Sequence, residues 1–222
     1  MPVEIEIKSL LGSAEAAGRL RSALQARGAV LSESSRQLNH YFTGSALAQL
    51  VERARTFLHP DQHIQLTDIA RRARKASVRT RLLNDTVLLI VKASLDDTTS
   101  ANGITRLEFE APANHLNVDQ LDAEVLKAGF EVQAMWSRQR EAYQLGAITI
   151  CLDKNAGYGW LAEFEIMADD DSLSVNQTAA LRSLMTELGV EELPQERLER
   201  MFAHYNANWR DYYGTDLTFT VD

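Results

Sequence analysis

Cysteine is almost missing from the chain, and this limits the kinds of site that the protein can form. Cys151 is the only cysteine among 222 residues. A single cysteine excludes an intrachain disulfide and any zinc centre built from several cysteines. Because Cys151 lies in an apolar stretch, we expect it to be an ordinary core residue.

Long hydrophobic runs and a secretory signal are missing as well. No apolar run approaches the roughly 18 residues that a membrane-spanning helix needs. The N-terminus carries Glu4 and Glu6 where a signal peptide would be basic and then apolar. The sequence therefore predicts a cytoplasmic protein that does not bind a membrane.

Positive charge is scarce, and it is unevenly distributed. The formal net charge is -8; residues 1–100 hold 14 Lys+Arg and 10 Asp+Glu, whereas residues 101–222 hold 9 and 21. Nucleic acids and anionic membranes are bound by extended basic faces, so neither is an expected partner. A small anion held in a closed basic pocket stays compatible with this composition, because the field inside such a pocket is local.

The first strand has the clearest pattern in the sequence. Over residues 3–8, which read Val-Glu-Ile-Glu-Ile-Lys, aliphatic and charged residues alternate without a break. Successive side chains of a strand point to opposite faces, so Glu4, Glu6 and Lys8 share one face. An ordinary half-exposed strand would give the same pattern, and the meaning of the charges therefore depends on the other strands.

Hydrophobic periodicity along the rest of the chain predicts eight strands, with helices between and after them. The strands are expected at residues 3–8, 29–43, 78–82, 88–92, 105–110, 130–144, 147–153 and 160–167. The helices are expected at residues 13–27, in two short pieces within 44–77, at 118–127, from about 174 to 189, and from near 194. The length suits a single domain, 1–222, with a helical insertion at about 44–77 and C-terminal helices from about 174.

Seven of the eight strands carry their ionisable residues on one face, while the opposite faces are aliphatic or aromatic. These residues are Glu4, Glu6, Lys8, Arg79, Arg81, Lys92, Arg106, Glu108, Glu110, Arg138, Arg140, Asp153, Glu163 and Glu165. If helices cover the apolar faces, the charged faces must point inward. We therefore predict an α+β fold in which an eight-stranded antiparallel β-barrel forms a tunnel with a charged interior, and the helices pack outside.

Seven acids and seven bases in one cavity imply a ligand that carries charges of both signs. An unpaired buried charge costs roughly several kcal/mol, and even a paired one seldom gains over a hydrophobic substitute. Carboxylates at Glu-x-Glu spacing suit a hard divalent cation, and paired arginines suit phosphate oxygens. Metal-bound polyphosphate meets both requirements. Surface ion pairs on an open sheet are the alternative, and they predict charges scattered over both faces of each strand.

The ordered set of motifs resembles the CYTH or triphosphate tunnel metalloenzyme family, named for class IV adenylyl cyclases and thiamine triphosphatases. The set begins with Glu-x-Glu-x-Lys, continues with an Arg-x-Arg strand, a lysine, a second Glu-x-Glu and a basic pair, and ends with an aspartate before a third Glu-x-Glu. It runs from residue 3 to about 167. The family's eight-stranded antiparallel tunnel agrees with the strand pattern.

The resemblance implies a role for each charged residue. The main ligands of Mg²⁺ or Mn²⁺ would be Glu4, Glu6, Glu163 and Glu165, assisted by Asp153, Glu108 and Glu110. The phosphate-binding set would be Lys8, Arg79, Arg81, Lys92, Arg106, Arg138 and Arg140, with Lys8, Lys92 and Arg138 as the candidate catalytic residues. Two departures are the length of the 44–77 stretch and Asn39, which stands where the family's second strand often has an acid.

The implied chemistry is metal-assisted phosphoryl transfer to one of two nucleophiles. Attack by water would make a triphosphatase acting on inorganic triphosphate, thiamine triphosphate or a nucleotide. Attack by the ribose hydroxyl of ATP would make an adenylyl cyclase, and a non-catalytic polyphosphate-binding module is a third interpretation. Hydrolysis is favoured because no residue set marks an adenine pocket, although Tyr158 and Trp160 flank the tunnel end. The expected partner is a small triphosphate, and a homodimer is left open.

Overall fold

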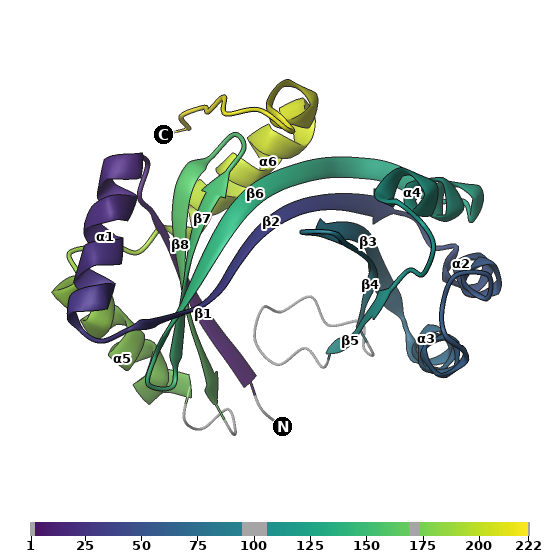
Figure 1. The fold of residues 1–222 in the computed structure, drawn as a ribbon, viewed down its shortest axis with the longest axis horizontal. Helices are drawn as coiled ribbons and strands as arrows, with labels where there is room; N and C mark the ends of the chain where they lie inside the picture. Colours follow the sequence, from purple (N-terminus) through teal and green to yellow (C-terminus); the bar gives the residue numbers. More distant parts are fainter. Residues whose placement is uncertain (1–2, 95–105, 169–173, 222) are drawn as a thin grey trace. The chain divides into compact units, whose positions relative to one another are not determined.

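The computed structural model describes residues 3–94, 106–168 and 174–221. In these ranges the chain forms one eight-stranded antiparallel sheet and six helices (Figure 1). The strands are β1 (Val3–Leu10), β2 (Val30–Thr43), β3 (Lys75–Leu83), β4 (Thr86–Ser94), β5 (Arg106–Pro112), β6 (Glu131–Leu145), β7 (Ile148–Asn155) and β8 (Gly159–Ala168). The helices are α1 (Ala14–Ala26), α2 (Leu47–Ala54), α3 (Pro60–Arg72), α4 (Val118–Lys127), α5 (Ser174–Glu187) and α6 (Gln195–Tyr212).

The α+β class and the eight antiparallel strands confirm the prediction from the sequence. The strand order is β1-β8-β7-β6-β2-β3-β4-β5, so β1 and β5 stand at the two ends of the sheet. Within the described residues no hydrogen bonds join these two strands, and closure into a tunnel stays a prediction. No helix in these ranges is long and apolar enough to cross a membrane.

The chain divides into two compact units, each with its own hydrophobic core. Unit 1 consists of Met1–Arg36 and Ser137–Asp222, and unit 2 consists of Gln37–Trp136. The strands β2 and β6 each contribute residues to both units. The single domain expected from the length of the chain stays a prediction.

In unit 1, helices α1 and α5 cover one face of β1, β7 and β8 (Figure 1). The core between them includes Leu20 of α1, Phe164 of β8 and Leu181 of α5, all less than 3% exposed. Helix α1 begins where the Ser13 hydroxyl accepts a hydrogen bond from the backbone of the first turn, and it ends before Gly28, whose φ is 79°. Ser13 and Gly28 therefore set the two ends of the helix.

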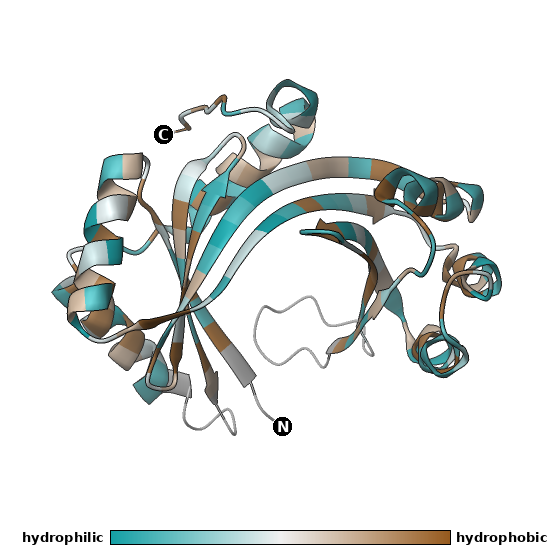
Figure 2. Ribbon diagram, in the orientation of Figure 1, coloured by the Kyte–Doolittle hydropathy of each residue, from teal (hydrophilic) through white to brown (hydrophobic). Residues whose placement is uncertain are grey.

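In unit 2, helices α2, α3 and α4 cover one face of β3, β4 and β5. Leu50, Leu66, Leu89 and Leu121 from these elements are fully buried together. The predicted interruption of the 44–77 stretch is confirmed, because Pro60 starts α3, at a position where its missing N–H does no harm. In Figure 2 hydrophilic and hydrophobic residues alternate along the helices and strands, as expected for elements that have one polar and one apolar face.

The C-terminal segment packs against the turn between β7 and β8. The backbone N–H of Gly157 donates to the carbonyl of Leu217 at 2.9 Å, and the N–H of Phe219 donates to the carbonyl of Gly157 at 2.8 Å. A Cβ at position 157 would lie 2.6 Å from the ring of Tyr205, which explains the glycine. The sequence left open whether this segment packs, and in unit 1 it does.

Candidate functional site

The strand register of unit 1 brings charged residues of β1 and β8 onto one face of the sheet. Glu6 lies opposite Glu165, and Lys8 lies opposite Glu163. Directly opposed residues of antiparallel strands share a face and lie close enough to interact. Ile7 lies between Glu6 and Lys8 and points to the opposite face, where it belongs to the core under α1 and α5. The predicted separation into a charged and an apolar face is therefore confirmed for these two strands.

Strands β6 and β7 continue the charged face of unit 1. We call this surface the acidic face; its described charged residues are Glu6, Lys8, Arg138, Arg140, Asp153, Glu163 and Glu165. In the register, Arg140 lies opposite Asp153, and Arg138 lies opposite Asn155. All seven residues were predicted as site residues, and the structure gathers them on one surface.

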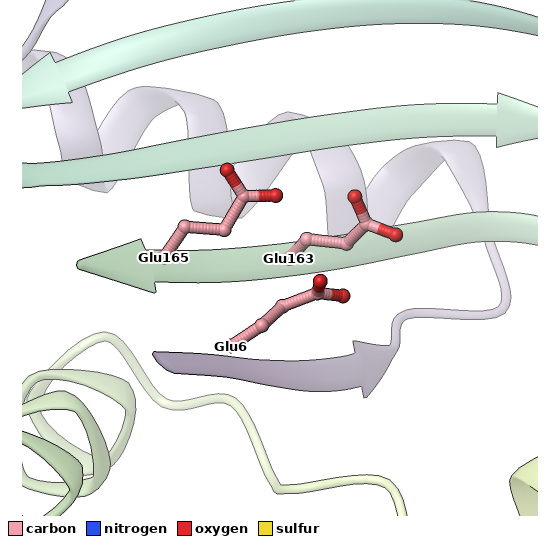
Figure 3. Close-up of side chains that lie close together, drawn as sticks. All are labelled: Glu6, Glu163 and Glu165. Atoms are coloured by element: carbon pink, nitrogen blue, oxygen red, sulfur yellow. The ribbon is translucent and has the colours of Figure 1, made fainter. Parts of the chain in front are cut away.

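Three carboxylates of the acidic face form a candidate metal centre. One oxygen each of Glu6, Glu163 and Glu165 lies within 4.8 Å of the others. Figure 3 shows Glu163 and Glu165 projecting from β8 and Glu6 from β1, with their carboxylates on the same side of the strands. Two oxygens bound to one Mg²⁺ or Ca²⁺ are at most about 4 to 5 Å apart. The three side chains could therefore share one hard cation.

Asp153 holds two arginines on the acidic face. It is fully buried, and its oxygens accept hydrogen bonds from Arg140 Nε at 2.7 Å, Arg140 Nη2 at 2.6 Å and Arg138 Nη1 at 3.0 Å. Burial alone would lower the pKa of Arg140, but the hydrogen bonds and the charge of Asp153 outweigh it, and the pKa of Arg140 is raised. The hydrogen bonds to Asp153 thus hold both guanidinium groups in position.

Glu163 connects the metal candidates to the cations. It is 9% exposed, and it accepts hydrogen bonds from Lys8 Nζ at 3.1 Å and from Arg140. Burial alone would raise the pKa of Glu163, but the charges of Lys8, Arg140 and Arg138 outweigh it and hold the pKa below its ordinary value. Glu163 is therefore ionised at neutral pH, which a metal ligand requires.

Cys151 lies on the same face, opposite Glu163 in the register. It is 3% exposed, which agrees with the predicted core position. Burial is the main reason that the pKa of the Cys151 thiol is raised to about 12, and the neighbouring carboxylates add to the rise. The thiol therefore stays neutral at physiological pH, and it offers no thiolate to a metal ion.

Unit 2 carries a second charged surface, which we call the basic face. Its described charged residues are Lys75, Arg79 and Arg81 of β3, Lys92 of β4, and Glu108 and Glu110 of β5. Lys92 lies opposite Glu108, with Nζ 3.1 Å from a carboxylate oxygen, and Arg81 Nη1 lies 3.4 Å from Glu110. All of these except Lys75 were predicted site residues.

Two neighbours of the arginines on the basic face were missed as candidate binding residues. Asn39 accepts a hydrogen bond from Arg81 Nε at 2.7 Å, and the Arg79 guanidinium stacks over the ring of Tyr41 at 4.5 Å. Trp136 meets the edge of the Tyr41 ring, with the centroids 6.3 Å apart. The sequence shows that Asn39 and Tyr41 alternate along β2, but only the strand register shows that they pair directly with the two arginines.

Four further residues named from the sequence are not among the described residues of either face. The side chains of Glu4 and Arg106 lie outside the part of the structure that is described. Tyr158 packs among aromatic rings, including Tyr205 at 5.6 Å between centroids. Trp160 packs against the core under α1 and α5. The two aromatic residues that were considered for contact with a base are thus occupied in packing.

Comparisons with known proteins agree with the resemblance noted in the sequence. The family model of the CYTH domain matches residues 2–197. A putative adenylate cyclase from Vibrio parahaemolyticus is 17% identical, with a TM-score of 0.56 over 90% of this chain and 97% of that chain. A conserved hypothetical protein from Pyrococcus furiosus is 17% identical, with a TM-score of 0.57 over 85% and 92%.

A third solved structure is the putative adenylyl cyclase HpAC1 from Hippeastrum, which is described as having a dominant triphosphatase activity. It is 16% identical, with a TM-score of 0.50 over 89% of this chain and 95% of that chain. No curated protein matches the sequence. At these identities the structural neighbours show a shared fold, whereas the family model covers most of the chain. The protein therefore belongs to the CYTH family.

Proposed function

We propose that this protein is a metal-dependent triphosphate hydrolase, which acts on inorganic triphosphate or on an organic triphosphate such as thiamine triphosphate or a nucleotide. The observation that carries the proposal is the cluster of Glu6, Glu163 and Glu165, which adjoins Lys8 and Arg140 on one sheet face. Carboxylate oxygens suit a hard cation, whereas ammonium and guanidinium groups suit phosphate. A ligand that combines a divalent ion with a polyphosphate uses both.

The formal charge of the acidic face supports the need for a metal. Its four described carboxylates and three described cations leave a charge of -1. A polyanion would be repelled from such a surface, whereas one bound divalent cation would change the formal charge to +1. Glu6, Glu163 and Glu165 would hold Mg²⁺ or Mn²⁺, whose charge would neutralise and orient the triphosphate.

The cations of the acidic face are arranged before any substrate arrives. Asp153 holds Arg138 and Arg140, and Glu163 holds Lys8, so these donors need little reorganisation to meet phosphate oxygens. Fixed donors aimed at developing charge are the main source of electrostatic catalysis. We assign them the stabilisation of negative charge that accumulates on the phosphate oxygens.

The basic face, taken by itself, is also suited to bind phosphate. Its four described cations exceed its two described carboxylates, and arginines such as Arg79 and Arg81 carry the two-donor fork that matches phosphate geometry. We assign Arg79, Arg81 and Lys92 to phosphate binding within unit 2. The carboxylates beside Arg81 and Lys92 are exposed, so an arriving anion can replace these partners at low cost.

Adenylyl cyclase activity is the alternative, because a cyclase would use the same metal and phosphate ligands. Two observations favour hydrolysis. Tyr158 and Trp160 are engaged in packing and are not presented to a base. The Hippeastrum neighbour, although named a putative adenylyl cyclase, is described as having a dominant triphosphatase activity.

Phosphate release tests the proposal directly. The purified protein should release phosphate from inorganic triphosphate, thiamine triphosphate or ATP only when Mg²⁺ or Mn²⁺ is present. A parallel assay with ATP should detect no cyclic AMP. Cyclic AMP as the main product would establish the cyclase instead. Tight triphosphate binding without release of phosphate from any of the three would establish the binding module.

A further inference from the structure

A buried polar cluster lies in unit 2 on the helix side of the sheet, away from the charged residues of the basic face. The hydroxyl of Thr80 on β3 donates to one carboxylate oxygen of Asp122 on α4 at 2.5 Å. The other carboxylate oxygen lies 2.6 Å from Nδ1 of His40 on β2. Thr80 is fully buried, and His40 and Asp122 are 2% and 9% exposed.

The strand register gives this cluster its position relative to the site. His40 and Thr80 are directly opposite each other on β2 and β3, so a single carboxylate contacts both members of one cross-strand pair. The two flanking pairs join Asn39 to Arg81 and Tyr41 to Arg79. Because side chains alternate between faces, those flanking pairs lie on the basic face.

Stability alone does not explain a carboxylate at this place. The surrounding core consists of apolar residues such as Phe42, Leu121 and Val125. Hydrophobic residues in place of all three members of the cluster would pack there without the cost of removing a charge from water, and such replacements of whole buried polar groups are often neutral or stabilising. A fully bonded polar cluster does, however, restrict which strand register the core accepts.

Register is the property on which the two arginines depend. A slip of β3 by one residue would turn Arg79 and Arg81 toward the apolar core and would remove Thr80 from Asp122. The hydrogen bonds at Asp122 can form only in the observed pairing of His40 with Thr80. The cluster therefore couples the position of α4 to the alignment of β2 with β3.

We propose that Asp122 is a positioning residue, which acts through His40 and Thr80 to fix the alignment of β3 and thereby the placement of Arg79 and Arg81. The inference rests on the proposed function, since it gives these arginines the task of binding triphosphate. Asp122 itself lies on the helix side of the sheet, opposite the side that carries Arg79 and Arg81. The hydrogen bonds to its carboxylate determine where the binding residues lie.

Thr80→Val and Thr80→Ser form a matched pair for the test. Valine keeps the shape of threonine but removes the donor to Asp122, whereas serine keeps the donor. Val125→Ala, in the same core and on the same helix, controls for loss of packing. We expect Thr80→Val to raise KM for inorganic triphosphate by up to about 100-fold, because the loss of a charge-assisted hydrogen bond to phosphate weakens binding by about this factor.

The other variants complete the expected pattern. Thr80→Ser should restore the parental KM, and Val125→Ala should lower the unfolding midpoint while KM stays unchanged. The effect of Thr80→Val should be larger on KM than on kcat, since the arginines are displaced and not removed. If Thr80→Val does not fold, Asp122→Asn replaces it, because it keeps the shape and removes the charge. A KM for Thr80→Val equal to that of Val125→Ala would overturn the proposal.

Hydrogen exchange separates this inference from the proposed function. Loss of the Thr80 donor should speed amide exchange selectively over residues 78–82, whereas Val125→Ala should not single out this segment. If the parent protein neither binds nor hydrolyses inorganic triphosphate, the proposed function fails, and the exchange pattern still decides whether Asp122 fixes β3. Equal exchange in both variants would overturn the positioning role.

Discussion

The acidic face of unit 1 and the basic face of unit 2 are built from similar residues but differ in burial. In unit 1 the side chains of Asp153 and Glu163 are 1% and 12% exposed, and the distances from Asp153 to its arginines are 2.6 to 3.0 Å. In unit 2 the side chains of Glu108 and Glu110 are 49% and 40% exposed, and their cations lie at 3.1 and 3.4 Å.

This difference indicates different tasks. Buried ion pairs are strongly interdependent, because the removal of one partner leaves the other charge unpaired and out of water. Exposed pairs contribute little, and their members can change partners without large loss. The acidic face is therefore suited to hold a fixed arrangement of metal ligands. The cations of the basic face can exchange their carboxylate partners for the oxygen atoms of an incoming anion.

The largest effect is expected from breaking the buried network. Asp153→Asn removes the charge that holds Arg138 and Arg140, and it should lower the free energy of unfolding by about 3–5 kcal/mol. Glu110→Gln, the matching change on the basic face, should cost less than about 1 kcal/mol. Urea unfolding of both variants measures the contrast. Similar losses in the two variants would mean that the faces do not differ in the way that their burial suggests.

The metal candidates provide a functional version of the same comparison. Glu165→Gln should lower metal-dependent turnover at least as much as the roughly 10- to 100-fold loss typical of changes near a metal site, because it removes a ligand charge. Glu6→Gln should behave alike, and both proteins should stay folded by circular dichroism. Glu15→Gln, on the exposed surface of α1, is the control. Turnover at the parental rate in Glu165→Gln and Glu6→Gln would remove these residues from the metal site.

Periodicity in the sequence was sufficient to predict much of this architecture. All eight strands and the helices follow it, and the bounds differ from the expected ones by a few residues. For example, β3 begins at Lys75, three residues before the expected start at Val78. The face that each charged residue occupies was also predictable, since alternation along a strand fixes it.

The detailed partners within the site could not be predicted in the same way. The contact of Asp153 with Arg138 and Arg140 depends on the register between β6 and β7, which a list of strands does not contain. The stacking of Arg79 on Tyr41 depends on the pairing of β2 with β3. Likewise, no pattern in the sequence indicates that Asp122 of α4 reaches these strands, because its contact with His40 spans 82 residues.

A smaller effect is expected on the basic face, where Arg81→Ala should weaken the binding of inorganic triphosphate. A charge-assisted hydrogen bond to phosphate is worth about 1.5–3 kcal/mol. Arg81→Ala also removes a hydrogen bond that the amide oxygen of the buried Asn39 accepts, so the free energy of unfolding should fall by about 1–3 kcal/mol. Calorimetric titration and urea unfolding measure the two quantities, and Arg55→Ala, at the exposed residue that follows α2, is the control. A change confined to stability would instead assign Arg81 to a structural ion pair.

The smallest effects are expected on the helix sides of the two units, where the units should behave alike. Glu141 in unit 1 has a pKa below the ordinary 4.5, mainly because of its hydrogen bonds from Arg21, which outweigh burial. Glu124 in unit 2 has a lowered pKa mainly because of its hydrogen bond from Lys127, with Arg53 adding to it. A carboxylate with a lowered pKa stabilises the folded protein above its unfolded pKa, and this contribution is lost as the pH falls through the folded pKa.

Glu141→Gln and Glu124→Gln should therefore each lower the unfolding free energy at pH 7 by about 1 kcal/mol or less. The difference from the parent protein should shrink in both variants as the pH falls below the ordinary glutamate pKa of 4.5. Urea unfolding at several pH values between neutral and acidic measures this. If the two variants show the same pH dependence while Asp153→Asn and Glu110→Gln differ, then the units differ in stability only at their charged faces. A large loss of unfolding free energy in only one of the two glutamate variants would instead show that the difference extends through the whole unit.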